Sequence, residues 1–391
     1  MRNLWVCLLL IGCGGSPSTL SGDDTPGDDV DGGVLNDADV TVDSQLDATP
    51  DAFMCTANTQ TDPDNCGECG HSCLGNACNA GTCASTRLDD GNTTGFGDFY
   101  TDGLFTYYTG FSGTTNPHRL WRIPLSGTPS YVGVIANPTP MSQVSFDGTD
   151  FYVVEPNRID TIDRGNIRKI GKEPFSESTL INFLEPTTTA TFIHNGFVYW
   201  ATDTDGANGG DIKKMPITGG QASTITVGAG FVQHMVTDGT NVYWVGGGQV
   251  KKAPLTGGVP VVIGASISKH ISTDGTSVYA INSDGWLVAI PVGGGSPTTL
   301  SEATLTTSVS SDDSHVYAAQ LGSKIVAVPK TGGTLVTLWS SAPVDLGNGC
   351  FSRAKISHVK VIDGWVYFSV PFVNSCGNVV LSEGLFRTPR M

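Results

Sequence analysis

The stretch DGTNVYWV, from Asp238 to Val245, holds the pattern that decides the fold. It joins an Asp-Gly pair to an apolar, aromatic-rich run, which predicts a tight hairpin because glycine takes the positive φ that such a turn needs. A turn of this type before such a run occurs seven times in the 391 residues, with Asn-Gly in one copy and Asp-Asp in another in place of Asp-Gly. The copies are DGLFTYY from Asp102, DGTDFYVV from Asp147, NGFVYWA from Asn195, DGTNVYWV from Asp238, DGTSVYAI from Asp274, DDSHVYAA from Asp312 and DGWVYFSV from Asp363.

The spacing of the copies indicates the architecture. A repeat of about 40–50 residues with four strands is typical of β-propeller blades. In the fifth copy we expect strands at Lys269–Thr273, Val278–Asn282, Trp286–Ile290 and Pro297–Leu300. The sequence therefore predicts an all-β protein whose residues 84–391 form a propeller of four-stranded blades. Seven blades are favoured, and six would result if the divergent first copy is not a blade.

The last copy ends at Met391, after its third strand, so its fourth strand must come from elsewhere. The stretch Ala84–Leu88, just before the first copy, is free to fill that place. Such a closure would remove the exposed strand edges of an open ring.

The first residues predict export and a lipid anchor. Arg2 precedes a short apolar run, Leu4–Ile11, which is too short to span a bilayer and is typical of a signal peptide over residues 1–12. The run ends in Leu10-Ile11-Gly12-Cys13, which resembles a bacterial lipobox whose cysteine becomes lipidated. Gly at residue 14 favours the outer membrane by the same resemblance, at the cell surface or the periplasmic face.

Residues 13–54 predict a disordered tether behind Cys13. They hold ten Asp and no Lys or Arg, and such a segment cannot bury enough apolar surface to fold. Removing these charges from the formal net charge of −16 leaves −6 for the rest of the chain. Since no basic stripe is present, nucleic acid is not expected as a partner.

Eight cysteines remain after the signal peptide and Cys13. In an exported chain, six of them within residues 55–83 favour a small disulfide-rich module over a zinc site, with the pairing left open. A disulfide between the other two would pin the last blade. The eight are Cys55, Cys66, Cys69, Cys73, Cys78, Cys83, Cys350 and Cys376.

Two resemblances add to this interpretation. The run from Asp62 to Cys73 follows the pattern D-P-x-N-C-G-x-C-G-x-x-C and resembles a Cys-rich module of exported myxobacterial-type proteins. The Val-Tyr-Trp runs ending at Trp200 and Trp244 resemble YWTD and TolB-like propellers. The Thr-Asp half of the YWTD signature is absent from most copies, so receptor-type ligand binding does not follow from the resemblance.

The candidate site comes from counting back eight residues from the valine of each Val-Tyr pair. These positions begin the inner strands and predict one level of the central tunnel. Three of them are histidines, which is the ligand set that zinc selects and resembles amidating-type lyase propellers, whose tunnel zinc is held by three His. The positions are Gln143, His234, His270, Ser308 and His358, with Gly97 and Ala190 by a looser alignment.

A second candidate site lies in the third copy, where Asp203, Asp205 and Asp211 crowd one loop with Asn208. Their oxygens could hold Ca²⁺, although the EF-hand pattern is absent. No common hydrolase or nucleotide-binding motif is present either.

The leading hypothesis is a monomeric, lipid-anchored propeller that binds a protein or saccharide, with Gln143 and Ser308 as further ligand contacts. The alternative hypothesis is a metal-dependent lyase or hydrolase acting at the three histidines.

Overall fold

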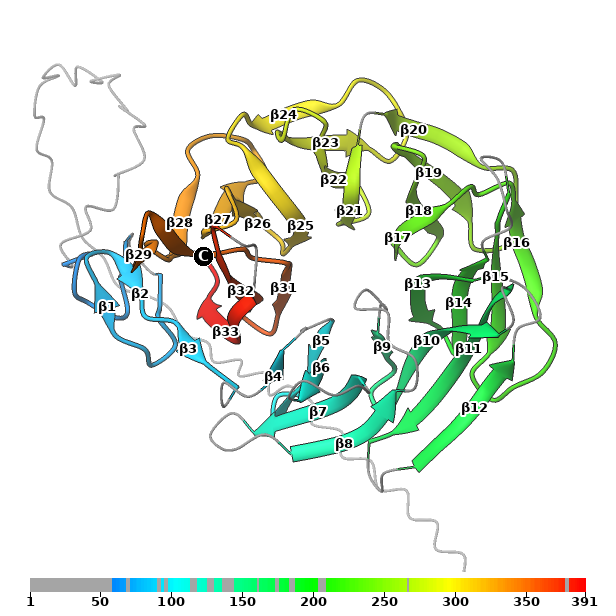
Figure 1. The fold of residues 1–391 in the computed structure, drawn as a ribbon. Coiled ribbons are helices and arrows are strands. Elements are labelled where there is room, and N and C mark those ends of the chain that lie inside the picture. The colour runs from blue at the N-terminus through cyan, green and yellow to red at the C-terminus, as the bar shows by residue number, and fades with distance from the viewer. Residues whose placement is uncertain are drawn as a thin grey trace, which may run out of the picture. The chain divides into compact units, whose positions relative to one another are not determined.

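The computed structural model describes residues 58–67, 71–89, 93–94, 98–112, 118–124, 130–135, 144–159, 162–172, 176–182, 187–202, 209–265, 267–376 and 380–391. All of them belong to one compact unit, Cys55–Met391. Seven antiparallel sheets stand side by side around a central axis and form a seven-bladed β-propeller (Figure 1). The prediction of seven blades is confirmed, and the divergent first copy is a blade. Among the described residues, no helix has the length and apolar character needed to cross a membrane.

Each blade runs from an inner strand at the axis to an outer strand at the rim. The strands of the first four blades are β5 (Phe99–Thr101), β6 (Phe105–Ser112), β7 (His118–Pro124) and β8 (Ser130–Ile135), with β4 (Thr93–Thr94) against β6; β9 (Val144–Phe146), β10 (Asp150–Ile159), β11 (Ile162–Gly171) and β12 (Ser176–Asn182); β13 (Thr187–His194), β14 (Phe197–Thr202), β15 (Asp211–Pro216) and β16 (Ser223–Val227); and β17 (Val232–Thr237), β18 (Asn241–Gly246), β19 (Gln249–Pro254) and β20 (Val261–Ala265).

The remaining three blades follow the same order, and in the fifth the predicted strands lie within two residues of those observed. Their strands are β21 (Ile267–Thr273), β22 (Ser277–Asn282), β23 (Leu287–Pro291) and β24 (Thr298–Ser301); β25 (Leu305–Ser311), β26 (His315–Gln320), β27 (Lys324–Pro329) and β28 (Val336–Ser340); and β31 (His358–Ile362), β32 (Trp365–Asn374), β33 (Val380–Pro389) and β3 (Thr86–Arg87).

The ring closes through β3, as the missing fourth strand predicted. Thr86 and Arg87 pair with Arg387 and Phe386 of β33. The next residues secure the junction, because the Leu88 amide donates to the Leu385 carbonyl at 2.8 Å. The seventh blade therefore takes three strands from the end of the chain and one from before the first blade, which leaves no open edge between the two.

The recurring Asp of the turns is bonded to the recurring Tyr of the following strand. In the fourth blade, one Asp238 oxygen accepts the amides of Thr240 and Asn241, and the other accepts the Tyr243 hydroxyl at 2.7 Å. The same carboxylate–hydroxyl bond occurs in four further blades. These pairs are Asp102–Tyr107, Asp147–Tyr152, Asp274–Tyr279 and Asp312–Tyr317.

The third and seventh copies have a different turn, one residue shorter. Asn195 and Asp363 themselves have positive φ values of 46° and 48°, so each begins a two-residue turn with the glycine that follows. The turn residue is then only four positions before the tyrosine. Tyr199 is accordingly buried without a carboxylate from its own turn.

The aromatic residues of the repeat form the cores between neighbouring blades. Trp200 packs with Tyr152 of the second blade, and Trp244 packs with Tyr199 of the third, and both indoles are fully buried. These aromatic side chains therefore belong to the core.

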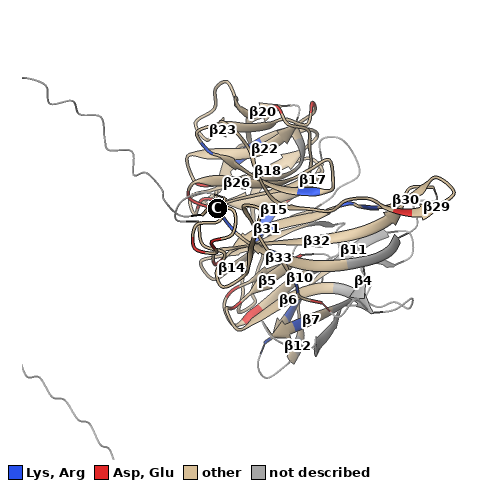
Figure 2. Ribbon diagram, turned by 90° about the vertical axis from the view of Figure 1, so that its left-hand side faces the viewer, with Lys and Arg blue, Asp and Glu red and all other residues tan. Residues whose placement is uncertain are grey.

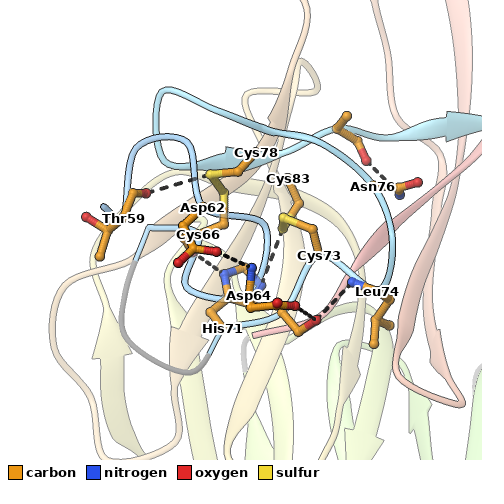
Figure 3. The surroundings of a disulfide bond; sticks show 12 residues. Thr59, Asp62, Asp64, Cys66, His71, Cys73, Leu74, Asn76, Cys78 and Cys83 are labelled. Carbon is orange, nitrogen blue, oxygen red and sulfur yellow. Dashed lines mark hydrogen bonds between the residues drawn. A yellow bond between two sulfur atoms is a disulfide. The ribbon is translucent and has the colours of Figure 1, made fainter. Parts of the chain in front are cut away.

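The Cys-rich module is held by the disulfides Cys66–Cys78 and Cys73–Cys83, around the short hairpin of β1 (Cys78–Asn79) and β2 (Thr82–Cys83) (Figure 3). His71 is buried beside them. One of its ring nitrogens is bonded to the Cys66 carbonyl, and the other lies 3.0 Å from the Arg390 carbonyl of the last blade. The preference for disulfides over zinc is confirmed for these four cysteines, while Cys55 and Cys69 lie outside the described residues.

The seventh blade carries an extra hairpin, β29 (Val344–Gly347) and β30 (Cys350–Ala354), which pairs with the far end of β32. In Figure 2 this hairpin projects beyond the neighbouring strands. The predicted disulfide Cys350–Cys376 is present and ties the hairpin to the end of β32.

Candidate functional site

The inner strands surround a cavity of about 560 Å³ at the centre of the ring. Its walls come from β5, β13, β17, β21, β25 and β31 together with the residues that precede them, so it is a tunnel site built by six blades. The volume lies in the range of small-ligand sites, about 300–1,000 Å³. Polar groups lie mainly on the fourth to seventh and first blades, and the rings of Phe192 and Phe231 lie on the third and fourth.

Four of the predicted positions line this one cavity: His234, His270, Ser308 and His358. They lie at one level of the tunnel. In each blade, the residue that follows the predicted position pairs with the residue that follows the repeated tyrosine in the blade's second strand. Met235 faces Trp244, Ile271 faces Ala280, Val309 faces Ala318 and Val359 faces Phe368.

The register corrects the position in the first blade. Phe99 faces Tyr108, just as Met235 faces Trp244, and this assigns the equivalent position to Asp98 rather than to Gly97. Asp98 lines the cavity. Counting back eight residues gives Gly97 when Phe105 is matched to the valine of the other copies, and Asp98 when Thr106, the residue before Tyr107, is matched to it. Ala190 of the third blade is buried in the core between blades and is not part of the cavity wall.

Irregular pairing marks four of the inner strands at this level. The pairing of β17 skips Gln233, and the pairings of β13, β21 and β25 are interrupted between Thr187 and Thr191, between Ile267 and Ile271 and between Leu305 and Val309. A bulge frees a residue from the ladder and redirects its side chain, and bulges are common beside functional sites. His270 and Ser308 lie within these interrupted segments.

The three histidines form an arc with His270 in the middle. The ring centroids of His234 and His270 are 5.1 Å apart, and those of His270 and His358 are 6.5 Å apart. Among the described residues, the only three ligand side chains whose donor atoms lie within 4.8 Å of one another are Cys66, Cys73 and Cys78, and these are in disulfides. In this arrangement the three imidazoles do not converge on one ion, so the zinc centre stays a prediction that requires side-chain movement.

An ion pair crosses the tunnel wall from the seventh blade to the first. The Lys360 ammonium donates to Asp98 at 3.1 Å and lies 3.5 Å from the centre of the Tyr100 ring. The same carboxylate accepts the Phe99 amide and the Val144 amide of the second blade. Asp98 therefore joins three consecutive inner strands, and its charge is used within the protein.

Burial and charge together keep the imidazoles of His234 and His358 neutral. Burial lowers the pKa of His234 well below its usual value, and His270, Lys360 and His358 add repulsion that lowers it further. Burial also lowers the pKa of His358, where attraction by Asp98 opposes the effect and repulsion by Lys360 adds to it. Burial opposes the charge of Lys360, but Asp98 and Tyr100 raise its pKa. At neutral pH the wall thus carries one ion pair and uncharged His234 and His358.

Several predicted positions lie outside the described residues: Gln143, Asp203, Asp205, Asn208 and Cys13. Asp211, the described member of the calcium hypothesis, begins β15, and its amide donates to the Thr202 hydroxyl at 2.8 Å. The calcium site stays a prediction.

Comparisons with known proteins give a fold and no family. No protein-family model matches the chain, and no curated protein matches it in sequence. Solved structures do match. The structure "YCF48 bound to D1 peptide" has a TM-score of 0.53 at 11% identity, over 79% of this chain and 95% of that one. YCF48 from Cyanidioschyzon merolae gives 0.52 at 14% identity, over 78% and 98%. Oligogalacturonate lyase from Vibrio parahaemolyticus gives 0.52 at 12% identity, over 78% and 91%. At these identities the likeness concerns the fold alone.

Proposed function

We propose that the protein is an exported, lipid-anchored propeller that binds a protein or peptide partner over its tunnel mouth. The observation that carries the proposal is the cavity of about 560 Å³, which charged, polar and aromatic side chains from six blades line together. Sites with an apolar wall and a few convergent polar groups are the usual form of a binding site.

Export is supported by the disulfides and by the start of the chain. Cys66–Cys78, Cys73–Cys83 and Cys350–Cys376 are typical of an oxidising compartment outside the cytoplasm. The lipobox-like run ending at Cys13 supplies the anchor in this proposal, and the Asp-rich tether behind it extends because like charges repel. We place the protein on the outer membrane.

A partner at the tunnel mouth is supported by Phe231. Its side chain precedes the inner strand β17, lines the cavity and is 54% exposed, although large aromatic side chains are usually buried. Aromatic residues beside a cavity are typical anchors of protein interfaces. In one of the similar structures YCF48 is bound to a peptide, and we extend that mode of binding to this chain as part of the proposal.

Site-specific photo-crosslinking tests the binding function. A benzoylphenylalanine at Phe231, in the full chain expressed in its native cells, should give a discrete adduct with a protein or peptide. The matched control is Leu104, which is 71% exposed but follows β5, at the opposite end of the inner strands. Equal adducts from both positions, or none from Phe231, would contradict the proposal.

The anchor is tested separately. Cys13→Ser should move the protein from the membrane fraction to the soluble fraction, because no lipid can be attached to serine at that position. A variant that stays in the membrane fraction like the wild type would show that the lipid assignment is wrong.

A further inference from the structure

The charged side chains of the tunnel wall neutralise each other. Among the described residues that line the cavity, the only acidic side chain is Asp98 and the only lysine or arginine is Lys360. The Lys360 ammonium donates to the Asp98 carboxylate at 3.1 Å and lies 3.5 Å from the centre of the Tyr100 ring. The carboxylate also accepts the amides of Phe99 and Val144. A charged group of a ligand would therefore meet no unpaired opposite charge on these two side chains.

Two histidines of the wall add no charge. Burial lowers the pKa of His234 well below its usual value and also lowers the pKa of His358. The position of the His234 ring fits a neutral state, because its buried Nδ1 has no hydrogen-bond partner in the described part of the chain. An imidazolium has two N–H groups that need acceptors, whereas a neutral imidazole has one. His234 and His358 therefore contribute to the wall as uncharged polar groups.

Uncharged side chains of three blades offer further hydrogen bonds. Gln233, which the pairing of β17 skips, lines the cavity, and its side-chain amide has no partner among the residues that the structure describes. The hydroxyl oxygens of Ser308 and Ser310 accept the amides of Val359 and Val361, at 2.6 and 3.0 Å, which leaves each hydroxyl hydrogen to donate. The wall thus presents an amide that can both donate and accept, together with hydroxyl donors.

An aromatic surface lies beside these polar groups. Phe192 is 8% exposed and Phe231 54% exposed, which places one ring in the wall and the other at the mouth of the tunnel. Aromatic rings gain free energy when an apolar or aromatic group covers them. A ligand that matches the whole cavity therefore joins an uncharged polar group to an apolar one.

We propose that the partner inserts an uncharged carboxamide side chain, of asparagine or glutamine, into the tunnel, where uncharged groups of the wall such as Gln233 and Ser308 bond it and an apolar neighbour packs against Phe231. This inference rests on the proposed binding function and names the chemical group that enters the cavity. A carboxamide exchanges its hydrogen bonds with water for bonds to the wall. A carboxylate or an ammonium would lose its hydration without gaining a counter-ion, so the cavity should select against charge.

The test compares three small probes by isothermal titration of the purified full chain. The probes are blocked dipeptides that join phenylalanine to glutamine, to glutamate or to lysine. At pH 8 a histidine of ordinary pKa is uncharged, whereas the glutamate and lysine side chains keep their charges. We expect the glutamine dipeptide to bind at least tenfold more tightly than either charged dipeptide.

A charge placed in the wall should change this preference. Gln233→Glu puts a carboxylate into the cavity, so the lysine dipeptide should then bind more tightly than the glutamine dipeptide. The matched control is Gln221→Glu, which adds the same charge at an exposed position outside the cavity wall and should leave the wild-type order unchanged. A melting curve of each variant shows that it is folded, and the comparison of the three dipeptides on the wild type does not depend on either variant.

Equal affinity of the wild type for the three dipeptides, or tighter binding of a charged one, would overturn the carboxamide assignment. The assignment would also fail if none of the dipeptides binds while the Phe231 crosslink still captures a partner, or if maltose, a neutral sugar, binds and the dipeptides do not. In each of these cases the Phe231 crosslink reports separately on the proposed function. Absence of that crosslink would overturn the proposed function itself.

Discussion

The Lys360 ammonium on the inner strand of the seventh blade donates to the Asp98 carboxylate of the first blade at 3.1 Å, across 262 residues of sequence. Because Asp98 also accepts the Val144 amide, at 3.2 Å, one carboxylate joins the seventh, first and second blades at the tunnel wall. The bond is therefore part of both the ring closure and the candidate site.

Asp98→Ala should lower the free energy of unfolding by about 2–3 kcal/mol, since it leaves a partly buried ammonium and two backbone amides without their acceptor. Asp98→Asn retains an acceptor oxygen and should cost less. Urea unfolding of both variants measures the difference. Equal stability of Asp98→Ala and the wild type would show that the pair does not contribute to closure.

The junction between β3 and β33 depends on Asp89. Its fully buried carboxylate accepts two bonds from Arg87, at 3.1 and 3.0 Å, and the Leu385 amide at 2.7 Å. Asp89→Ala should destabilise the ring by about 2–3 kcal/mol because a buried amide loses its partner. Asp284→Ala, in an exposed turn, is the control. If thermal unfolding gives the same midpoint for both variants, the closing strand is not held in this way.

The two turn classes make a matched pair of predictions. Tyr243→Phe removes a hydroxyl bonded to the Asp238 carboxylate and should cost about 1–2 kcal/mol. Tyr199→Phe removes a hydroxyl that has no such bond from its own turn and should change stability by less. Denaturant unfolding of the two variants gives the comparison, and equal losses would mean that the Asp–Tyr bond does not stabilise the blade.

The histidine arc predicts a loss of stability in weak acid. Burial and the repulsion from His270, Lys360 and His358 lower the pKa of folded His234, so between its unfolded value of about 6.5 and the lower folded value the unfolded chain binds more protons. The free energy of unfolding should therefore fall as pH drops below about 6.5. His358 contributes in the same direction, with Asp98 opposing the effect.

His234→Gln cannot take up the proton, so its stability should depend less on pH between 7 and 5.5. The slope of the free energy of unfolding against pH should be smaller in the variant than in the wild type by up to about 1.4 kcal/mol per pH unit, which corresponds to one proton. Urea unfolding at several pH values measures both slopes. Parallel curves for the variant and the wild type would show that His234 does not titrate as its surroundings predict.

The sequence predicted the blades well because each carries its own local signals. The Asp-Gly-type turn and the aromatic strand recur within one unit, so even the strand supplied by Ala84–Leu88 could be inferred from the incomplete last copy. The division of the turns into two classes is also visible in the sequence, since Tyr199 and Tyr367 follow their turns one residue sooner than the other five tyrosines.

Only some of the residues of the candidate site could be predicted from the sequence. His234, His270, Ser308 and His358 share a fixed offset from a repeated tyrosine, so periodicity placed them at one level. Lys360 and Phe231 have no such repeat, because each blade varies these positions independently. The contact between Asp98 and Lys360 depends on ring closure, which brings the first and last blades together, and no local pattern indicates it.

The central claim is that the partner binds over the tunnel mouth and reaches from there into the cavity. Filling the cavity tests this most directly. Gln233 is the residue skipped by the β17 ladder and lines the cavity, so Gln233→Trp should occupy it, whereas Thr299→Trp on the exposed outer strand β24 should not. The measurement is the yield of the Phe231 crosslink in each background. We predict that Gln233→Trp abolishes the adduct and that Thr299→Trp leaves it unchanged; an undiminished adduct with the folded Gln233→Trp variant would contradict the claim.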